Sequence, residues 1–198
     1  MNLLKNAVIF FAFVIVSISI SAQRIKINDG NLSALKSEKT INVEFTYDNM
    51  KVGKFDKEDD YLSTKKEEYN KKEPGRGDNW AKAWVSDRGF RFEPKFNELF
   101  EKYSELSIKK DSKYTLIFHT TFTEPGFNVG VWKKNAEING EAWLVETANH
   151  SNVIAKISVE KVPGRSFWGG DYDTGERIAE CYADGGKALG KFIKDKSK

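Results

Sequence analysis

The sequence predicts an α+β protein, a two-layer sandwich in which a mid-chain helix and a C-terminal helix cover a mixed, mainly antiparallel sheet of about four strands. Three observations predict this class. Four segments show the alternation, or the β-branched and aromatic content, of strands. Two segments repeat apolar residues at three- and four-residue steps, as helices with one buried face do. No internal repeat is present, so we expect one domain over residues 40–198.

The four predicted strands form one early strand and a later group of three. They cover residues 41–52, 114–123, 142–147 and 153–162. In the second, YTLIFHTTFT, we expect one face to carry Tyr114, Leu116, Phe118 and Phe122. Helices connect the first two strands, so these can lie parallel. The last three strands should form an antiparallel meander.

Helix signals mark two regions in the middle of the chain. Asp78 or Asn79 can cap a short helix that carries Trp80 and Trp84 and that Gly89 ends. A proline at position 94 suits the first turn of a second helix. The predicted buried face of this second helix contains Phe96, Leu99, Phe100, Tyr103 and Leu106.

The last helix has the clearest signals. Asp173 stands three residues before Glu176, as in a capping box. One face of the helix contains Ile178, Tyr182, Leu189 and Ile193. Beside this face, Gly186 and Gly190 belong to a strip of small residues. Because glycine inside a helix costs up to ~1 kcal/mol relative to alanine, the two glycines predict close packing against a sheet or another helix.

Two segments have weaker patterns. Residues 54–77 carry dense mixed charge and end at Pro74-Gly75. A solvated helix around residues 61–70 stays open, but a mobile excursion is favoured. Residues 23–39 are polar with scattered apolar positions, which indicates either a tether or a short edge strand.

The first 22 residues have the pattern of a secretory signal peptide. Lys5 precedes an uncharged run, AVIFFAFVIVSISI, and the small residues Ser21 and Ala22 follow it. The run is shorter than the roughly 20 apolar residues of a spanning helix, so cleavage after Ala22 is favoured over an uncleaved anchor. The sequence therefore predicts an exported protein, periplasmic or extracellular, without a transmembrane segment after cleavage.

The charge balance and the single cysteine indicate which partners and which covalent bonds to expect. Removal of residues 1–22 takes away Lys5 alone and leaves 31 Lys and Arg against 29 Asp and Glu. Both signs are interspersed, so a nucleic-acid partner is not expected. Cys181, the only cysteine, cannot form an internal disulfide, and its apolar helical setting favours a buried side chain. The oligomeric state is left open.

No catalytic, metal or cofactor motif is recognisable, and we expect none of the three. His119 lies in the strongest strand and His150 in a hairpin loop, and neither has a partner at ligand spacing. The acidic residues at positions 56–60 lack the glycine and distal glutamate of a helix–loop–helix calcium loop, which favours a solvated charge run.

Aromatic residues in glycine-rich segments are the predicted binding residues. They are Phe127, Val129 and Trp132 in FNVGVWKKN, and Trp168 and Tyr172 in RSFWGGDYD. Loops seldom carry so much apolar surface, so these segments either fold back onto the core, which is slightly favoured, or form a recognition edge.

Residues 114–194 resemble a family of uncharacterised exported proteins of Gram-negative bacteria. The resemblance rests on the runs TTFTEPGFNVGVWKKNAEINGEAWLVE and VEKVPGRSFWGGDYDTGERIAECYADGGKALGKFIK. More distantly, the meander and terminal helix are similar to accessory domains of periplasmic and outer-membrane proteins. The resemblance implies no known activity. The chain departs from lipoprotein members of the wider group because it lacks an N-terminal cysteine for acylation.

Three hypotheses for function follow. The leading one is a non-enzymatic module that binds a protein or glycan of the cell envelope. The second is a hydrolase with dispersed carboxylates, for which the candidates are Glu124, Glu146, Asp171 and Asp173. The third is a self-assembling structural protein that pairs through an exposed first strand.

Overall fold

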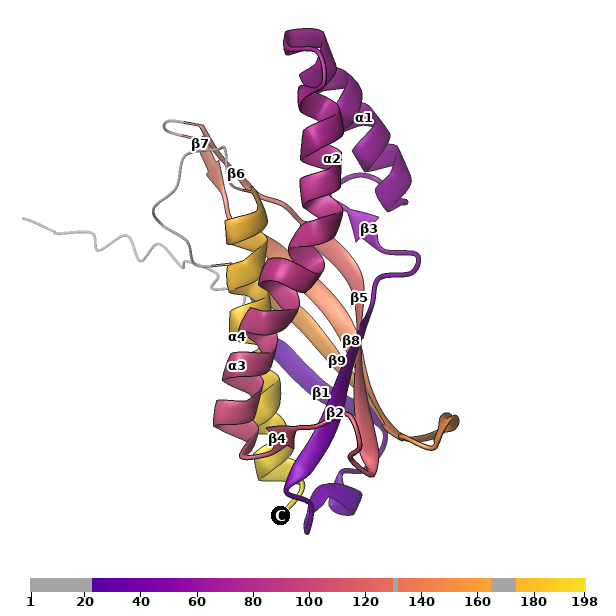
Figure 1. The fold of residues 1–198 in the computed structure, drawn as a ribbon. Coiled ribbons are helices and arrows are strands. Elements are labelled where there is room, and N and C mark those ends of the chain that lie inside the picture. The colour runs from indigo at the N-terminus through magenta and orange to yellow at the C-terminus, as the bar shows by residue number, and fades with distance from the viewer. Residues whose placement is uncertain (1–22, 130–131, 165–173) are drawn as a thin grey trace, which may run out of the picture.

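The protein is an α+β fold, seen here in a computed structural model that describes residues 23–129, 132–164 and 174–198 (Figure 1). The strands are β1 Arg24–Gly30, β2 Thr40–Thr46, β3 Lys51–Val52, β4 Ser107–Ile108, β5 Tyr114–Glu124, β6 Phe127–Val129, β7 Trp132–Lys134, β8 Glu137–Glu146 and β9 Asn149–Pro163. The helices are α1 Glu58–Lys72, α2 Arg76–Asp87, α3 Glu93–Ser104 and α4 Thr174–Lys196, with a short 3₁₀ turn, η1, at Ser33–Leu35 and a π turn, η2, at Arg88–Phe92.

The main sheet has seven strands, more than the four that the sequence predicts. Its order is β1-β9-β8-β5-β2-β4, and β3 pairs with β5 beyond the end of β2. As predicted, β2 and β5 are parallel, and β5, β8 and β9 form an antiparallel meander. The additional strands β3 and β4 have two residues each, too short to show a sequence period. The residues left open as tether or edge strand form β1, which pairs with β9.

Helices α3 and α4 cover the same side of the sheet (Figure 1). The core between the layers is aromatic, and its fully buried members include Phe96 and Phe118, whose ring centroids are 4.9 Å apart. Tyr182 of α4 stacks on Phe92 at 5.0 Å. The buried faces predicted for the two helices are therefore largely confirmed, with Leu99 and Tyr103 only half-buried.

The small-residue strip of α4 packs against α3, as the sequence predicts. A Cβ atom added at Gly186 would lie 2.2 Å from the Phe96 carbonyl oxygen, and one at Gly190 would lie 2.9 Å from that of Phe100. Backbone atoms cannot retreat as a flexible side chain can. The two glycines therefore allow an interhelical approach that alanine would prevent.

The charged segment 54–77 is not a loose excursion. It contains the 15-residue helix α1, which packs against α2 in an arm that extends past the end of the sheet (Figure 1). The rings of Tyr61 and Trp84 lie 5.1 Å apart, and those of Tyr69 and Trp80 lie 5.5 Å apart. A Cβ atom at Gly77 would meet the backbone of α1 at 2.0 Å. Two tyrosines at one helical face, rather than a continuous apolar stripe, stabilise this helix.

Two local predictions are wrong. Gly89 does not end a helix, because the backbone continues from α2 through the π turn into α3. Phe122 does not share the buried face of β5, because the register shifts between Thr120 and Phe122 and leaves Thr123 buried in its place. A β-bulge of this kind moves each following residue to the opposite face.

The contact between α3 and α4 gives a matched test. Gly186→Ala should lower the free energy of unfolding by ~1–3 kcal/mol, because the added methyl group meets backbone. Gly185→Ala should leave stability unchanged or raise it by up to ~1 kcal/mol, since its Cβ would lie 3.6 Å from Val162 and alanine favours the helix. Urea unfolding of both variants, compared with the wild type, measures the two free energies of unfolding. Equal destabilisation would contradict the close contact.

Candidate functional site

Strands β6 and β7 form a two-stranded hairpin separate from the main sheet (Figure 1). Phe127 pairs with Lys134, and Val129 pairs with Trp132. Phe127 and Trp132 are therefore diagonal neighbours on one face of the hairpin, within reach of aromatic side chains. The Trp132 side chain is 74% exposed and that of Phe127 is 40% exposed. An exposed aromatic pair on an extended hairpin is a candidate recognition surface.

The base of this hairpin is fixed to α4. The buried guanidinium of Arg177 donates hydrogen bonds to the carbonyl oxygens of Pro125 and Gly126, at 3.2 and 3.3 Å. Gly126 has a φ of 66°, and a Cβ atom there would lie 2.5 Å from the Lys134 carbonyl oxygen. Lys134 forms a 2.5 Å ion pair with Glu124 across the same base. These contacts hold the two ends of the hairpin together.

The predicted binding residues have different outcomes. For Trp132, the slightly favoured packing into the core is wrong, since most of its side chain faces solvent. The backbone of Val129 belongs to β6. Trp168 and Tyr172 lie outside the described residues.

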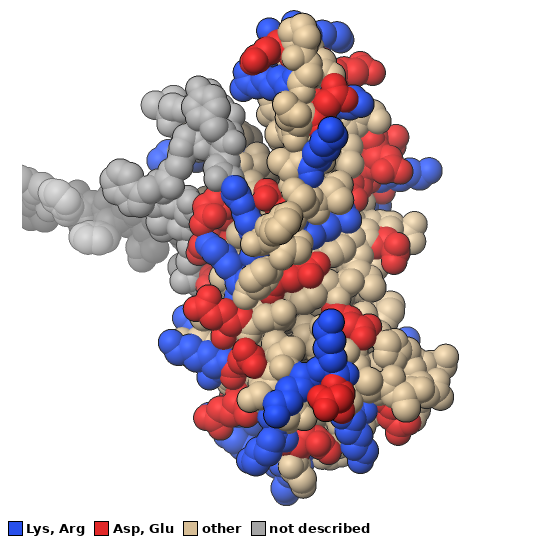
Figure 2. Space-filling view, viewed as in Figure 1, with Lys and Arg blue, Asp and Glu red and all other residues tan. Residues whose placement is uncertain are grey.

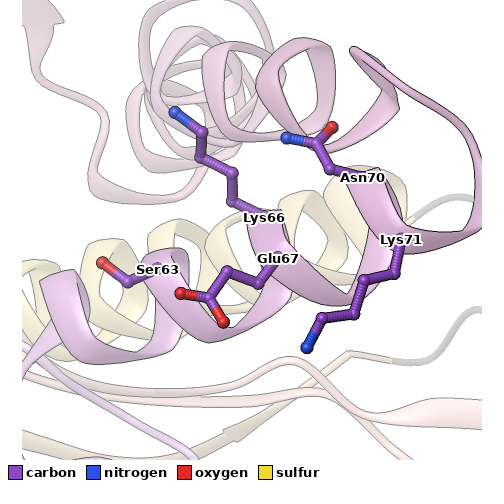
Figure 3. Close-up of a pocket in the computed structure, with 5 residues that line it drawn as sticks. All are labelled: Ser63, Lys66, Glu67, Asn70 and Lys71. Carbon is purple, nitrogen blue, oxygen red and sulfur yellow. The ribbon is translucent and has the colours of Figure 1, made fainter.

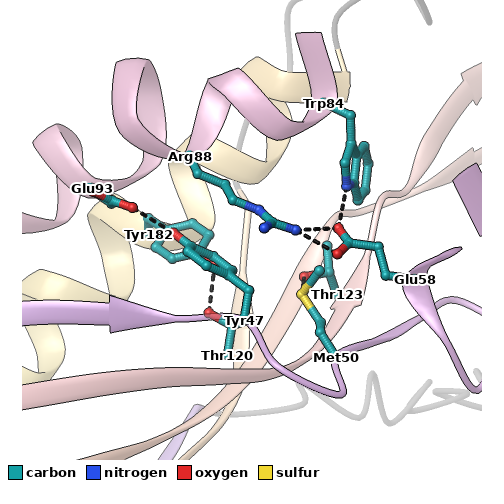
Figure 4. Close-up of polar contacts among 9 residues, drawn as sticks. All are labelled: Tyr47, Met50, Glu58, Trp84, Arg88, Glu93, Thr120, Thr123 and Tyr182. Atoms are coloured by element: carbon teal, nitrogen blue, oxygen red, sulfur yellow. Dashed lines mark hydrogen bonds and ion pairs between the residues drawn. The ribbon is translucent and has the colours of Figure 1, made fainter. Parts of the chain in front are cut away.

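A polar network joins α1, α2, the π turn and the end of β2 (Figure 4). The Arg88 guanidinium donates to both carboxylate oxygens of Glu58, at 2.5 and 2.6 Å, and Trp84 Nε1 donates to the same carboxylate at 2.6 Å. Arg88 also lies 4.2 Å above the Tyr47 ring. The side chains of Arg88 and Glu58 are 20% and 16% exposed, so the pair is largely removed from water. Sequence reasoning missed this network because its members lie on four separate elements.

Two further hydrogen bonds continue the network toward the core. Tyr47 donates to Glu93 at 3.2 Å, and the hydroxyls of Thr120 and Tyr182 lie 2.7 Å apart (Figure 4). Burial raises the pKa of Tyr47 and of Tyr182 above the ordinary 10.0, and it does the same for Tyr61 in the arm. Each phenol therefore stays protonated in the folded protein at neutral pH. The Tyr47 hydroxyl links the end of β2 to α3, and the Tyr182 hydroxyl links α4 to β5.

Two of the cavities are lined in part by charged side chains that already bind other residues. One of about 490 Å³ is lined by Ser63, Lys66, Glu67, Asn70 and Lys71, all on α1 (Figure 3). Lys66 and Asn70 are already bound to Asp78, at 2.7 and 2.9 Å. A second, of about 380 Å³, lies beside Tyr47 and Glu58. There the network occupies Glu58, and Asp56 forms an ion pair with Lys51.

The structure does not bring together Glu124 and Glu146, the two predicted catalytic carboxylates among the described residues. Glu124 pairs with Glu137 at one end of the β5–β8 ladder, and Glu146 pairs with Tyr114 at the other. Ten residues of strand separate the two ends by roughly 33 Å, beyond the ~9 Å that a pair of glycosidase carboxylates tolerates. Asp171 and Asp173 lie outside the described residues. No group of three or more His, Cys, Asp or Glu in the described part could hold a metal ion.

Cys181 is buried in α4, as expected, and burial raises the pKa of its thiol. Lysines and arginines alternate with acidic residues over the described part of the face shown in Figure 2. Within the described ranges, no helix is long and apolar enough to cross a bilayer.

Comparison with known proteins identifies no family for this chain and only distant structural similarity. Neither a family model nor a curated protein matches the chain. Among solved structures, the PelC dodecamer from Paraburkholderia phytofirmans has a TM-score of 0.38 and 10% sequence identity, covering 83% of this chain and 97% of its own. A variant of that PelC gives 0.37 and 11%, with coverages of 83% and 98%. At these scores, no inference about this chain follows.

The buried tyrosines predict an alkaline transition. Their pKa values are raised by folding, so their contribution to stability is complete below about pH 10 and is lost as pH rises further. Tyr47, Tyr61 and Tyr182 should ionise only as the protein unfolds. Tyrosinate absorbance and circular dichroism, followed together against pH, check this. Ionisation of all seven tyrosines before any loss of structure would contradict it.

Proposed function

We propose that the chain is an exported, non-enzymatic binding module of the cell envelope, and that the β6–β7 hairpin contacts a partner protein. The observation that carries this proposal is the 74% exposure of Trp132 on a hairpin whose base is fixed by Arg177. Tryptophan is the residue type most enriched among interaction hot spots. A fixed base lowers the ordering entropy that binding would cost.

The chemistry of the hairpin indicates the kind of partner. Phe127 and Trp132 supply apolar surface on one face, and the exposed Lys133, which pairs with Asn128, adds a positive charge on the other face. A protein with an apolar pocket and an acidic rim complements this surface. Export is supported by the signal-peptide pattern of residues 1–22.

Export predicts the mature N-terminus. Expression of the full-length chain in a Gram-negative host should give a product that begins at Gln23 and is recovered from the periplasm or medium. Intact-mass measurement and fractionation check this. A product that retains residues 1–22 in the membrane fraction would contradict the export proposal.

Partner binding predicts site-specific crosslinking. A photo-reactive phenylalanine analogue at position 132 should give a discrete protein adduct in the producing cells, identified by mass spectrometry. The same analogue at position 90 should not, although Phe90 is 81% exposed, because it lies on the π turn rather than on the hairpin. Affinity for the identified partner should fall at least about thirtyfold in Trp132→Ala.

The matched control for that affinity is Phe90→Ala, which removes a ring of similar exposure away from the hairpin. Both variants should keep the wild-type melting temperature, since neither ring is packed in the core. Adducts of equal yield from positions 132 and 90, or unchanged affinity in Trp132→Ala, would refute the hairpin as the contact surface.

A further inference from the structure

The side of the main sheet opposite α3 and α4 carries a second candidate binding surface. Two neighbouring rows of residues, each running across the strands, form this surface, which we call the open face. The first row contains Glu44, Ile117, Trp143 and Lys156. The second contains Thr46, His119, Glu141 and Ser158. Residues directly opposite one another in a sheet share a face, so these eight side chains project to the same side.

The open face lies away from the main core. Its neighbours along the strands, Leu116, Phe118, Ala142 and Leu144, are buried against the helices. Ile117, His119 and Trp143 are only half-buried. In Figure 1 the helices α3 and α4 lie on the other side of these strands. At one end the start of β9 approaches the surface, where His150 Nδ1 is 3.9 Å from Glu44 Oε2.

Aromatic and polar groups on the open face hold one another in place. The rings of His119 and Trp143 stack with centroids 5.6 Å apart and planes at 27°. Trp143 Nε1 donates to Glu141 Oε2 at 3.0 Å, and the Thr46 hydroxyl lies 2.8 Å from His119 Nδ1. The orientation of the indole, the imidazole and the carboxylate is therefore set before any ligand arrives. Such preorganisation lowers the entropic cost of binding.

Several polar atoms beside the indole are unused. Among the described residues, Glu141 Oε1, His119 Nε2 and Lys156 Nζ have no protein partner. Glu141 Oε1 can accept a hydrogen bond and Lys156 Nζ can donate one. His119 Nε2 can donate or accept, depending on the tautomer of the imidazole. The two rows carry the carboxylates of Glu44 and Glu141 and the ammonium group of Lys156, which pairs with Asp29 of β1, so charges of both signs are present.

We propose that the open face binds an uncharged saccharide. A sugar ring combines an apolar face of C–H groups with a rim of hydroxyls. The C–H face can stack on the flat indole of Trp143, and the hydroxyls can bind the donors and acceptors around it. A purely apolar partner would leave Glu141 and Lys156 desolvated and unpaired, at a cost. An anionic polymer would meet more carboxylates (Glu44, Glu141 and Asp29) than ammonium groups (Lys156). The surface is separate from the β6–β7 hairpin, so this proposal and the protein-binding proposal can fail independently.

The test is a glycan array probed with residues 23–198. The array holds neutral oligosaccharides, with and without N-acetyl groups, and negatively charged uronic-acid oligosaccharides. Wild-type protein should bind neutral oligosaccharides, and titration of the best of them should show affinity reduced at least about tenfold in Trp143→Ala. Trp132→Ala should bind like wild type, because it removes an exposed indole from the hairpin instead.

Two further measurements keep the test decisive where Trp143→Ala loses stability. Trp143→Leu keeps apolar volume but removes the flat ring, and it should lose affinity as the alanine variant does. Backbone-amide shifts of the wild-type protein with the same oligosaccharide should concentrate in the middle of β5, β8 and β9. An array without neutral binders, a preference for uronic acids that salt abolishes, or shifts confined to other regions would each overturn the proposal.

Discussion

The close contact between α3 and α4 is the constraint on which the rest of the structure depends. Backbone of α3 occupies the space where side chains at Gly186 and Gly190 would stand, so the two helices form one layer on a single side of the sheet. This layer brings Phe96 and Tyr182 over Phe118 of the central strand. Bulkier residues at the two glycines would separate the helices and open the aromatic core, whose large rings already fill the space.

The helix layer also places the two projecting parts of the molecule. Its α4 supplies Arg177, which holds the base of the β6–β7 hairpin, while the π turn before α3 supplies Arg88, which holds α1. In each case an arginine with low exposure binds a neighbouring segment, through carbonyl oxygens in the first and a carboxylate in the second. A buried arginine left without its acceptor is costly, so both segments are tied to the core.

Sequence patterns predicted the central elements well, because those elements have long one-sided faces. The strand at residues 114–123 and the helix that contains Ile178 and Leu189 both bury a continuous face against the core. The predictions fail for elements whose secondary structure depends on contacts with residues far away in the sequence. Helix α1 depends on Tyr61 meeting Trp84, and the two-residue strands β3 and β4 exist only through their partners. For the hairpin, the residue types were identified, but the exposure of Trp132 required the structure.

Polar side chains divide between an inward-facing network and an outward-facing sheet surface. In the described part of the chain, the inward-facing polar side chains Glu58, Arg88 and Tyr182 bind one another or neighbouring elements of the fold. Other hydrogen-bonding atoms without a protein partner lie outside, beside the indole of Trp143 on the open face. The inward-facing groups therefore tie elements of the fold to one another, while the atoms beside Trp143 stay accessible from solvent, which is the arrangement on which the saccharide proposal rests.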